Sequence, residues 1–322
     1  MALQLKRPRV CQAPPAIGRG GRAVRGAKTL FRFWEIFTVA SMEPFLLIAG
    51  PCLLESWELG DTVAQTLAAI RDRHRELRLI FKASVDKANR SSIHSARGMG
   101  IIRGLDALAR IKAKYQFEVV SDFHEPAQAE IFAEVCDVLQ VPAFLCRQTD
   151  MLAAAARTGR TVALKKGQFL SPWDMAHVVE KLRTFGAREI FQIERGSSFG
   201  YGNLVVDMRG FRIMAANGCP VLFDVTHSLQ LPGLGEESTA GAREYADVLA
   251  RAAIGAGAGG LFLETHPNPD FALCDRETQL PLENLEERLE SYLHLRRAVE
   301  EWAEKSRFGQ SDDPDYGDNG SG

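Results

Sequence analysis

From Leu79 to Ser92 the chain reads LIFKASVDKANRSS. The stretch opens as an apolar β-strand and continues as a polar run with three cations, Lys82, Lys87 and Arg90. Cations at the mouth of a buried strand are costly unless something anionic meets them. Arginine matches a phosphate with two hydrogen bonds, and lysine adds a point charge. The stretch therefore predicts a phosphate-bearing substrate, and a charged loop after an edge strand is the alternative.

Runs of similar apolar character recur along the chain. There are eight: Phe45–Ala49, Leu79–Ala83, Glu118–Ser121, Val138–Val141, Val162–Leu164, Glu189–Ile193, Val221–Val225 and Gly260–Leu263. Near-continuous apolar strands are typical of a parallel sheet covered on both faces, and helical patterns lie between these runs. We therefore predict an α/β fold, a single (β/α)8 TIM barrel. A two-domain doubly wound sheet is the alternative.

Local signals indicate where some helices begin and end. Ser56 can cap a helix over Trp57–Arg75, and Ser171–Asp174 (SPWD) is typical of a helix start. A long amphipathic helix is expected from about Leu282 to about Lys305. The run Gly255–Gly260 fits G-x-G-x-x-G, but it ends a helical pattern and precedes a strand. We interpret it as close packing and a turn, because a dinucleotide site needs the opposite order.

The composition is that of an ordinary globular protein, with 322 residues, 46% hydrophobic and 25% charged, and a net charge of −2. This near-neutral charge gives no reason to expect a nucleic acid as partner. No apolar run reaches the ~18 residues that span a bilayer, so no membrane partner is expected. Six cysteines are scattered without a CxxC pair. They favour a reduced, cytoplasmic protein over a disulfide scaffold.

We expect three segments. Residues 1–41 are basic, with Glu35 as the only acid. We interpret them as a disordered extension or a mis-assigned start, because Met42 stands directly before the first strand-like run, and an organelle presequence is the alternative. Residues 42–305 are the barrel domain. Residues 306–322 are rich in Gly, Ser and Asp and are expected to be a disordered tail.

In a barrel of this kind the active site lies at the carboxyl ends of the strands. Each of the eight runs is followed by polar or metal-binding side chains, or contains one near its end. These are Cys52; Lys82 and Lys87; Asp122 and His124; Gln140; Lys165 and Lys166; Glu194 and Arg195; His227; and Glu264 and His266. Scattered surface charge would not be so ordered, so we expect one shared site.

The strand ends suggest two kinds of chemistry. Cations that suit one or two phosphates and a carboxylate are Lys82, Lys87, Arg90, Lys165 and Arg195. Donors that suit a divalent Fe, Mn, Co or Zn ion are Cys52, His227, Glu264 and Asp275. Ligands from separate strand ends fit an open, catalytic metal site. The alternatives are that Cys52 is a small buried residue and that His124 or His266 takes the place of His227.

The segment Ser228–Gly241 is rich in Gly and small polar residues and follows the seventh run. Its length without an obvious element favours a mobile lid over a plain connecting loop.

Four stretches resemble the 3-deoxy-D-manno-octulosonate 8-phosphate synthases, also called 2-dehydro-3-deoxyphosphooctonate aldolases. They are Phe81–Ser92, Pro142–Asp150, Phe199–Asp207 and Asp224–Gln230. The resemblance covers roughly Phe45 to Trp302. It implies a (β/α)8 barrel and a transferase that condenses phosphoenolpyruvate with D-arabinose 5-phosphate and water, in KDO and lipopolysaccharide biosynthesis. It also implies a homotetramer.

The resemblance further implies residue roles. Phosphoenolpyruvate would be held by Lys82, Ser84, Lys87, Gln140, Ala143, Lys165, Arg195 and His227. The pentose phosphate would be held by Asn89, Arg90 and Ser91, with Arg147 facing it across a subunit boundary. Asp122 and Asp275 would lie near the aldehyde and the attacking water. The implied catalytic residues are Lys87, Asp122, His227 and Asp275.

The same family has metal-dependent members with Cys after the first strand and metal-independent members with Asn there. Cys52 makes this chain resemble the metal-dependent class. Its implied metal ligands are Cys52, His227, Glu264 and Asp275.

Three rival functions are considered. The related 3-deoxy-D-arabino-heptulosonate 7-phosphate synthases use erythrose 4-phosphate, but the run Ala88–Ser92 differs from their Pro-Arg-Thr. A Schiff-base aldolase would use Lys165 as its amine. A non-catalytic sugar-phosphate binding barrel would be expected to lack one or more of the strand-end groups, and all of those that we can match are present.

Overall fold

The computed structural model describes residues 44–90, 92–234 and 240–308. The predicted extension 1–41, most of the tail 306–322, Ser91 and five residues of the predicted lid lie outside the described residues. The predicted boundary at residue 305 falls inside the last helix, which ends at Phe308.

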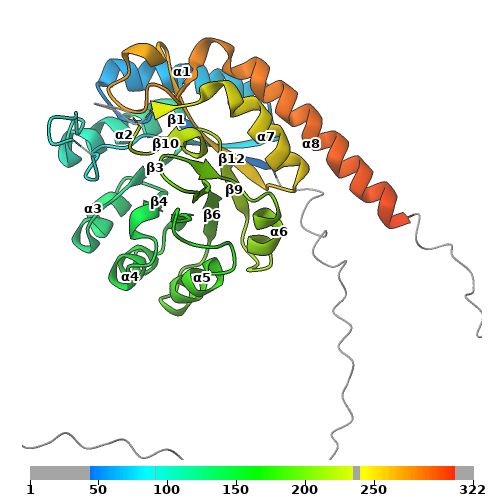
Figure 1. The fold of residues 1–322 in the computed structure, drawn as a ribbon. Coiled ribbons are helices and arrows are strands. Elements are labelled where there is room, and N and C mark those ends of the chain that lie inside the picture. The colour runs from blue at the N-terminus through cyan, green and yellow to red at the C-terminus, as the bar shows by residue number, and fades with distance from the viewer. Residues whose placement is uncertain (1–43, 91, 235–239, 309–322) are drawn as a thin grey trace, which may run out of the picture. The chain divides into compact units, whose positions relative to one another are not determined.

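Eight parallel strands form the barrel, as predicted (Figure 1). They are β1 (Phe45–Gly50), β2 (Leu77–Lys82), β3 (Glu118–Asp122), β4 (Val138–Val141), β5 (Thr161–Lys165), β6 (Ile190–Glu194), β9 (Val221–Asp224) and β12 (Gly260–His266). Each strand pairs with the next, and β12 pairs with β1, so the sheet closes on itself. A short strand, β13 (Leu280–Pro281), pairs with the end of β12. The single-barrel prediction is confirmed, and the doubly wound alternative is wrong.

Side chains on each strand alternate between two apolar layers. On β1, Leu46 and Ile48 belong to a small cluster that also holds Val120 and Phe191, and this cluster fills the barrel. Phe45 and its alternate neighbours join a larger cluster formed with the surrounding helices. Both faces of the sheet are therefore buried, which explains why the strands are apolar throughout.

Helices surround the strands (Figure 1). They are α1 (Trp57–Arg73), α2 (Ile101–Tyr115), α3 (Ala129–Ala133), α4 (Thr149–Arg157), α5 (Met175–Thr184), α6 (Arg209–Ala215), α7 (Ala246–Gly255) and α8 (Leu285–Phe308). Ser56 caps α1 as predicted, its hydroxyl accepting from the Leu59 amide. The expected start at Ser171 forms instead a turn closed by Asp174, and α5 begins at Met175.

The glycine run has the role expected from its order. Helix α7 ends at Gly255, and β12 begins at Gly260. A Cβ on Gly260 would lie 2.3 Å from the Leu46 carbonyl oxygen, so only glycine lets β12 approach β1 at the seam of the barrel.

Two short hairpins stand on the loops after the strands. One pairs β7 (Ser197–Ser198) with β8 (Leu204–Val205), and the other pairs β10 (Gln230–Leu231) with β11 (Ala240–Gly241). The two strands of the second hairpin lie in the described parts of the predicted lid.

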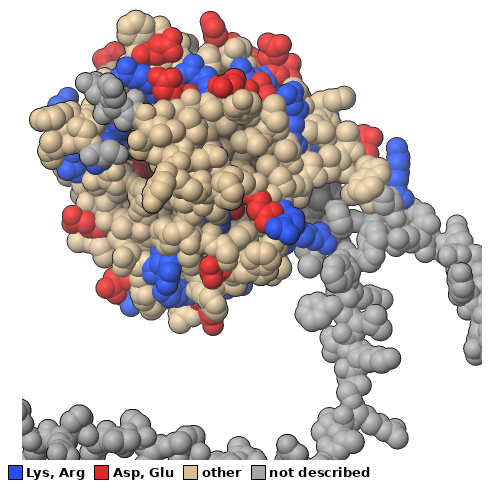
Figure 2. Space-filling view, in the orientation of Figure 1, with Lys and Arg blue, Asp and Glu red and all other residues tan. Residues whose placement is uncertain are grey.

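The described surface mixes both signs of charge. Figure 2 shows one face, on which Lys, Arg, Asp and Glu lie mostly around the edge while other residues cover the middle. Across the described ranges, no helix is both long and apolar enough to cross a membrane.

The buried thiol of Cys136 makes stability depend on alkaline pH. Burial raises the pKa of Cys136 to about 12. Above about pH 8.5 the unfolded chain loses this proton while the folded chain keeps it, so stability falls as pH rises. Cys136→Ala should reduce the slope of unfolding free energy against pH by up to about 1.4 kcal/mol per pH unit between roughly pH 9 and 11. Urea unfolding at a series of pH values measures this slope. An unchanged slope in Cys136→Ala would contradict the raised pKa of Cys136. Between pH 6 and 8 the unfolding free energies of the two proteins should change equally with pH, which is the control.

Candidate active site

The carboxyl ends of β1 and β2 are held together by a close backbone contact. A Cβ on Gly50 would lie 1.9 Å from the Lys82 carbonyl oxygen, so β1 must end in glycine. Just beyond it, Leu53 bridges to Ser84. This contact fixes Cys52 beside the polar run that follows β2.

Lys82 forms an ion pair in the barrel mouth. Its ammonium group lies 2.5 Å from Glu264 Oε1 and 3.0 Å from the Cys52 carbonyl oxygen, and both charged side chains are buried. Burial would raise the pKa of Glu264, but the His227 ring and the Lys82 charge outweigh it and bring the pKa to about 2. The second oxygen of Glu264, Oε2, has no hydrogen-bond partner within the described part of the chain.

A second buried pair joins β5 to β9. The Lys165 ammonium lies 2.7 Å from Asp224 Oδ2 and 3.6 Å from the centre of the Phe262 ring. Asp224 also lies 3.0 Å from His227 Nδ1. Burial lowers the pKa of Lys165, and the Asp224 charge offsets this only in part. Asp224 thus fixes the imidazole so that its other nitrogen faces the centre of the site.

Arg195 is linked to Asp275 through Gln230. Its Nη2 donates to the His227 carbonyl oxygen and to Gln230 Oε1, and Gln230 Nε2 donates to Asp275 Oδ1 at 3.0 Å. Asp275 has a left-handed backbone with φ of 47°, which is rare outside glycine. This strained position turns its carboxylate toward the strand ends.

The predicted metal ligands form two triads that share Asp275. One contains His227, Glu264 and Asp275, in which His227 Nε2 lies 3.6 Å from Glu264 Oε2 and 3.9 Å from Asp275 Oδ2. The other contains Cys52, Cys274 and Asp275. The structure therefore brings all four predicted ligands to one place and adds Cys274 to them.

Lys87 and Asp122 are opposite charges in the same region. The Lys87 side chain is buried; burial alone would lower its pKa, but the neighbouring Cys52 and Cys274 raise it well above the usual value. Burial would raise the pKa of Asp122, but His124, 3.3 Å away, and the Lys87 charge hold it well below the usual range. Both groups are therefore charged at neutral pH.

Several buried polar atoms at the strand ends lack partners. Among the residues that the structure describes, these include Ser84 Oγ, Asp122 Oδ1, Gln140 Oε1, Arg195 Nη1 and Glu264 Oε2. An orphaned buried polar group costs ~1–3 kcal/mol, so such groups are normally satisfied by protein, water or a bound group. Five of them, all from the predicted site, indicate a place built for a polar ligand.

The residues predicted to hold the pentose phosphate lie farther out. Asn89 is exposed, and Arg90 is half-buried. The Arg90 guanidinium donates to the carbonyl oxygens of Ala96 and Leu273 and to Cys274 Sγ. Ser91 lies outside the described residues. The structure thus brings Arg90 to the edge of the buried cluster.

Beyond β4, Ala143 begins a short turn over residues 143–145 and is half-buried, whereas Arg147 is exposed. Lys181 donates to the Arg147 carbonyl oxygen. Within the described ranges, the Arg147 side chain has no hydrogen bond or ion pair to the buried cluster.

Three strand-end residues, Lys166, His124 and His266, contact neighbouring residues and do not join the metal-donor triads. Lys166 donates to the carbonyl oxygens of Gly167, Leu170 and Gly196 and lies 3.3 Å from Glu194, so this pair ties loops together. It points away from Lys165 because neighbouring side chains on a strand alternate. His266 lies 3.7 Å from Glu55 and does not join the His227 triad, and His124 lies beside Asp122.

Sequence reasoning missed Asp224, Gln230 and Cys274 as site residues. Asp224 and Gln230 were visible as polar ends of the quoted DVTHSLQ run. Cys274 directly precedes Asp275 in the sequence. Gln279 secures the pair of cysteines, because it accepts from the Cys52 amide and donates to the Cys274 carbonyl oxygen.

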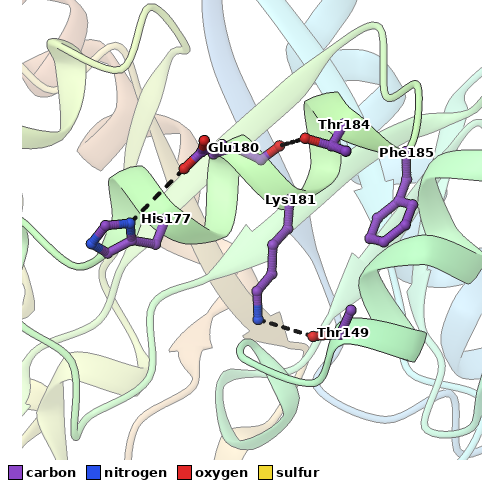
Figure 3. A pocket seen from close by; sticks show the side chains of 6 residues that line it. All are labelled: Thr149, His177, Glu180, Lys181, Thr184 and Phe185. Carbon is purple, nitrogen blue, oxygen red and sulfur yellow. Dashed lines mark hydrogen bonds and ion pairs between the residues drawn. The ribbon is translucent and has the colours of Figure 1, made fainter. Parts of the chain in front are cut away.

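A separate cavity of about 410 Å³ lies between α4 and α5 on the outer wall (Figure 3). It is lined by Thr149, His177, Glu180, Lys181, Thr184 and Phe185, and Lys181 bonds Thr149 across it. None of the strand-end groups takes part, so this hollow is a gap between helices and not the site of chemistry.

The amino-acid sequence is similar to those of several known proteins. The DAHP synthetase I family matches residues 38–301. A "2-dehydro-3-deoxyphosphooctonate aldolase" of Desulfotalea psychrophila is 51% identical over 82% of this chain and 94% of its own. Proteins of the same name from a Synechococcus strain and from Nitratidesulfovibrio vulgaris are 48% and 53% identical, over 86% and 74% of this chain and 98% and 87% of their own.

Proposed function

Because the chain belongs to the DAHP synthetase I family, among its 2-dehydro-3-deoxyphosphooctonate aldolases, we propose that the strand-end cluster holds both substrates of that reaction. The protein is a carbon–carbon bond-forming transferase. It condenses phosphoenolpyruvate with D-arabinose 5-phosphate and water, giving 3-deoxy-D-manno-octulosonate 8-phosphate and inorganic phosphate. This is a step of KDO and lipopolysaccharide biosynthesis.

The observation that carries the assignment of the site is the set of orphaned buried polar atoms. Ser84, Gln140 and Arg195 each offer one, and all three are predicted to hold phosphoenolpyruvate. Lys82, Lys87 and Lys165 add buried positive charge around them. A compact dianion or trianion, such as phosphoenolpyruvate, would complete these hydrogen bonds and balance the charge.

The residue charges suit the chemistry. Carbon C3 of phosphoenolpyruvate forms a bond to the aldehyde carbon, which leaves negative charge on the aldehyde oxygen and positive charge at C2. We assign Lys87 to the aldehyde oxygen, because it remains a cation, and the ionised Asp122 to the C2 side. Water then adds to C2 and gives up a proton, and the aldehyde oxygen gains one. The bond from C2 to the phosphate oxygen then breaks as the new C2 hydroxyl passes its proton to the departing phosphate, which leaves a ketone at C2. Holding both reactants in one mouth supplies the orientation.

We assign the pentose phosphate to the outer residues Asn89, Arg90 and Ser91. Each nitrogen of the Arg90 guanidinium donates one hydrogen bond within the described part of the protein, and the second N–H of Nη1 and of Nη2 is left to bind a phosphate. Arg147 is assigned to the same phosphate from a neighbouring subunit, which its exposure permits.

We propose that a divalent ion is held by Cys52, His227, Glu264 and Asp275. The donor set fits: Glu264 Oε2 is buried and orphaned, and His227 Nε2 and Asp275 Oδ2 face it. Mixed sulfur, nitrogen and oxygen donors suit Fe²⁺, Mn²⁺, Co²⁺ or Zn²⁺. Such an ion would orient the aldehyde and the attacking water. Asp224 keeps the His227 ring turned toward it.

We propose a homo-oligomer, a tetramer, formed through the loops that follow the central strands. Phe144, Phe169, Phe199 and Tyr201 are all exposed large aromatics on these loops. The loops touch: a Cβ on Gly167 would lie 2.9 Å from the Phe169 ring and 3.0 Å from the Ala143 carbonyl oxygen. Exposed aromatics gathered beside a site are typical of a protein interface. The patch adjoins Arg147, as a shared phosphate site requires.

We also infer a cytoplasmic setting. The described cysteines are all free thiols, and Cys136 and Cys146 are buried in apolar surroundings. Free buried thiols are typical of reducing compartments.

One observation favours the Schiff-base alternative: the lowered pKa of Lys165. An amine of depressed pKa is the nucleophile that such chemistry needs. Against it, the Lys165 ammonium is held in an ion pair with Asp224, which stabilises the protonated form.

A phosphate-release assay tests substrate and metal together. Chelator-treated protein should lose most of its activity with phosphoenolpyruvate and arabinose 5-phosphate, and Mn²⁺, Fe²⁺, Co²⁺ or Zn²⁺ should restore it, because the ion completes the site. Erythrose 4-phosphate should be a poor substitute. Absence of activity with arabinose 5-phosphate under every metal would overturn the assignment, whereas full activity after chelation would refute the metal dependence alone.

Borohydride trapping tests Lys165. Treatment in the presence of either substrate should leave the mass of the Lys165 peptide unchanged, because no imine forms. Fragmentation of this peptide distinguishes Lys165 from the adjacent Lys166, which serves as the internal control. A reduced adduct on Lys165 would instead support the Schiff-base mechanism.

Light scattering after size exclusion tests the oligomer. The wild type should run at four times its chain mass of 35.5 kDa. Phe199→Glu should shift it to smaller species, because a charge in an apolar interface is costly. Val248→Glu, on the outer helix α7, is the matched exposed control and should leave the mass unchanged. A monomeric wild type, or equal behaviour of the two variants, would argue against this interface.

A further inference from the structure

The site holds a second thiol that the family resemblance does not assign. Cys274 Sγ lies 2.9 Å from Cys52 Sγ and 3.3 Å from Asp275 Oδ2, and Cys52 Sγ lies 3.1 Å from the same oxygen. Both cysteines are free and almost fully buried. Two sulfurs and a carboxylate oxygen therefore converge on one point.

This convergence is fixed by the surrounding backbone. Gln279 clamps the two cysteines, because its side-chain oxygen accepts from the Cys52 amide at 3.2 Å and its nitrogen donates to the Cys274 carbonyl at 2.8 Å. The left-handed backbone of Asp275 turns its carboxylate back toward both sulfurs. A site whose ligands are held by such outer contacts is preorganised for an ion.

Positive charge is available to balance a second thiolate. Arg90 Nη1 lies 3.0 Å from Cys274 Sγ, and Lys82 is hydrogen-bonded to Glu264 and to the Cys52 carbonyl oxygen. Glu264 Oε2, buried and without a partner among the described residues, marks the neighbouring ligand position. Thiol hydrogen bonds are weak, so they alone would not offset the desolvation cost of burying this many polar groups together.

We propose that Cys274 is a further metal ligand, so that the ion is held by two sulfurs, from Cys52 and Cys274, together with His227, Glu264 and Asp275. The inference rests on the proposed function, whose metal site it enlarges. Two thiolates favour softer ions, so Zn²⁺, Fe²⁺ and Co²⁺ should bind in preference to Mn²⁺. The thiolate of Cys274 would also place the ion beside Arg90, and so beside the proposed pentose phosphate site.

Cobalt spectroscopy on the full-length protein tests this without any activity measurement. Co²⁺-loaded wild type should show a sulfur-to-cobalt charge-transfer band in the near ultraviolet. Cys274→Ser and Cys52→Ser should each keep about half of the band, because its intensity follows the number of sulfur ligands. Cys219→Ser, a free cysteine outside the site, is the matched control and should keep all of it.

A second readout compares metals by chelator competition. Cys274→Ser should weaken Co²⁺ and Zn²⁺ binding by at least about tenfold while changing Mn²⁺ binding less. Cys274→Ala serves as a second variant, and thermal melting of the metal-free proteins checks that both fold.

The outcomes are distinct. A full-strength band and unchanged affinities in folded Cys274→Ser, with loss of the whole band in Cys52→Ser, would overturn the role of Cys274 and leave the proposed function intact. A wild type without the band would overturn the metal site itself. If the phosphate-release assay fails but Cys274→Ser and Cys52→Ser each keep about half of the band, the proposed substrates are wrong and the two-thiol metal site is supported.

Discussion

The structure depends on closing the sheet at the seam between β12 and β1. Gly260 and Gly50 permit the close backbone contacts on either side of β1. Closure brings the end of β2 opposite the end of β12, and the Lys82–Glu264 ion pair spans this distance inside the barrel mouth. A buried ion pair gains little stability over an apolar pair, and breaking one is costly. We therefore interpret the Lys82–Glu264 pair as part of a charged site and not as a major source of stability for the fold.

The site is organised as two groups of charged residues. Inside, Lys82 pairs with Glu264, and Lys165 pairs with Asp224, which also keeps His227 oriented. Farther along the loop that follows β2, the buried Lys87 is electrostatically close to Cys52 and Cys274, and the half-buried Arg90 donates to Cys274 Sγ. This arrangement lets the barrel fold before substrates arrive, because the two innermost cations, Lys82 and Lys165, each have a buried carboxylate as partner. It also leaves single buried polar atoms without hydrogen-bond partners where ligands would bind, so a polar substrate can form those hydrogen bonds.

The neighbourhood of Cys274 links the two reactant regions. Its sulfur touches both the proposed metal donors and Arg90, which is assigned to the pentose phosphate. Metal and sugar phosphate would thus share one residue between them. Asp275, with its left-handed backbone, is the pivot of this arrangement, since it joins both triads and the Gln230 link to Arg195.

The sequence by itself determined the barrel and predicted most of the residues that the structure gathers at its mouth. Apolar strands buried on both faces and polar residues after each strand are one-dimensional signals, so eight strands and the set from Cys52 to Asp275 could be predicted. Tertiary structure alone decided the partners. Lys165 and Lys166 look equivalent in sequence, but strand alternation sends one into the mouth and the other into loop carbonyls. Likewise Cys274 lies more than two hundred residues from Cys52, and only the closed sheet brings their sulfurs together. Contact between such distant segments depends on strand register and on closure of the sheet, and no local sequence pattern determines either of them.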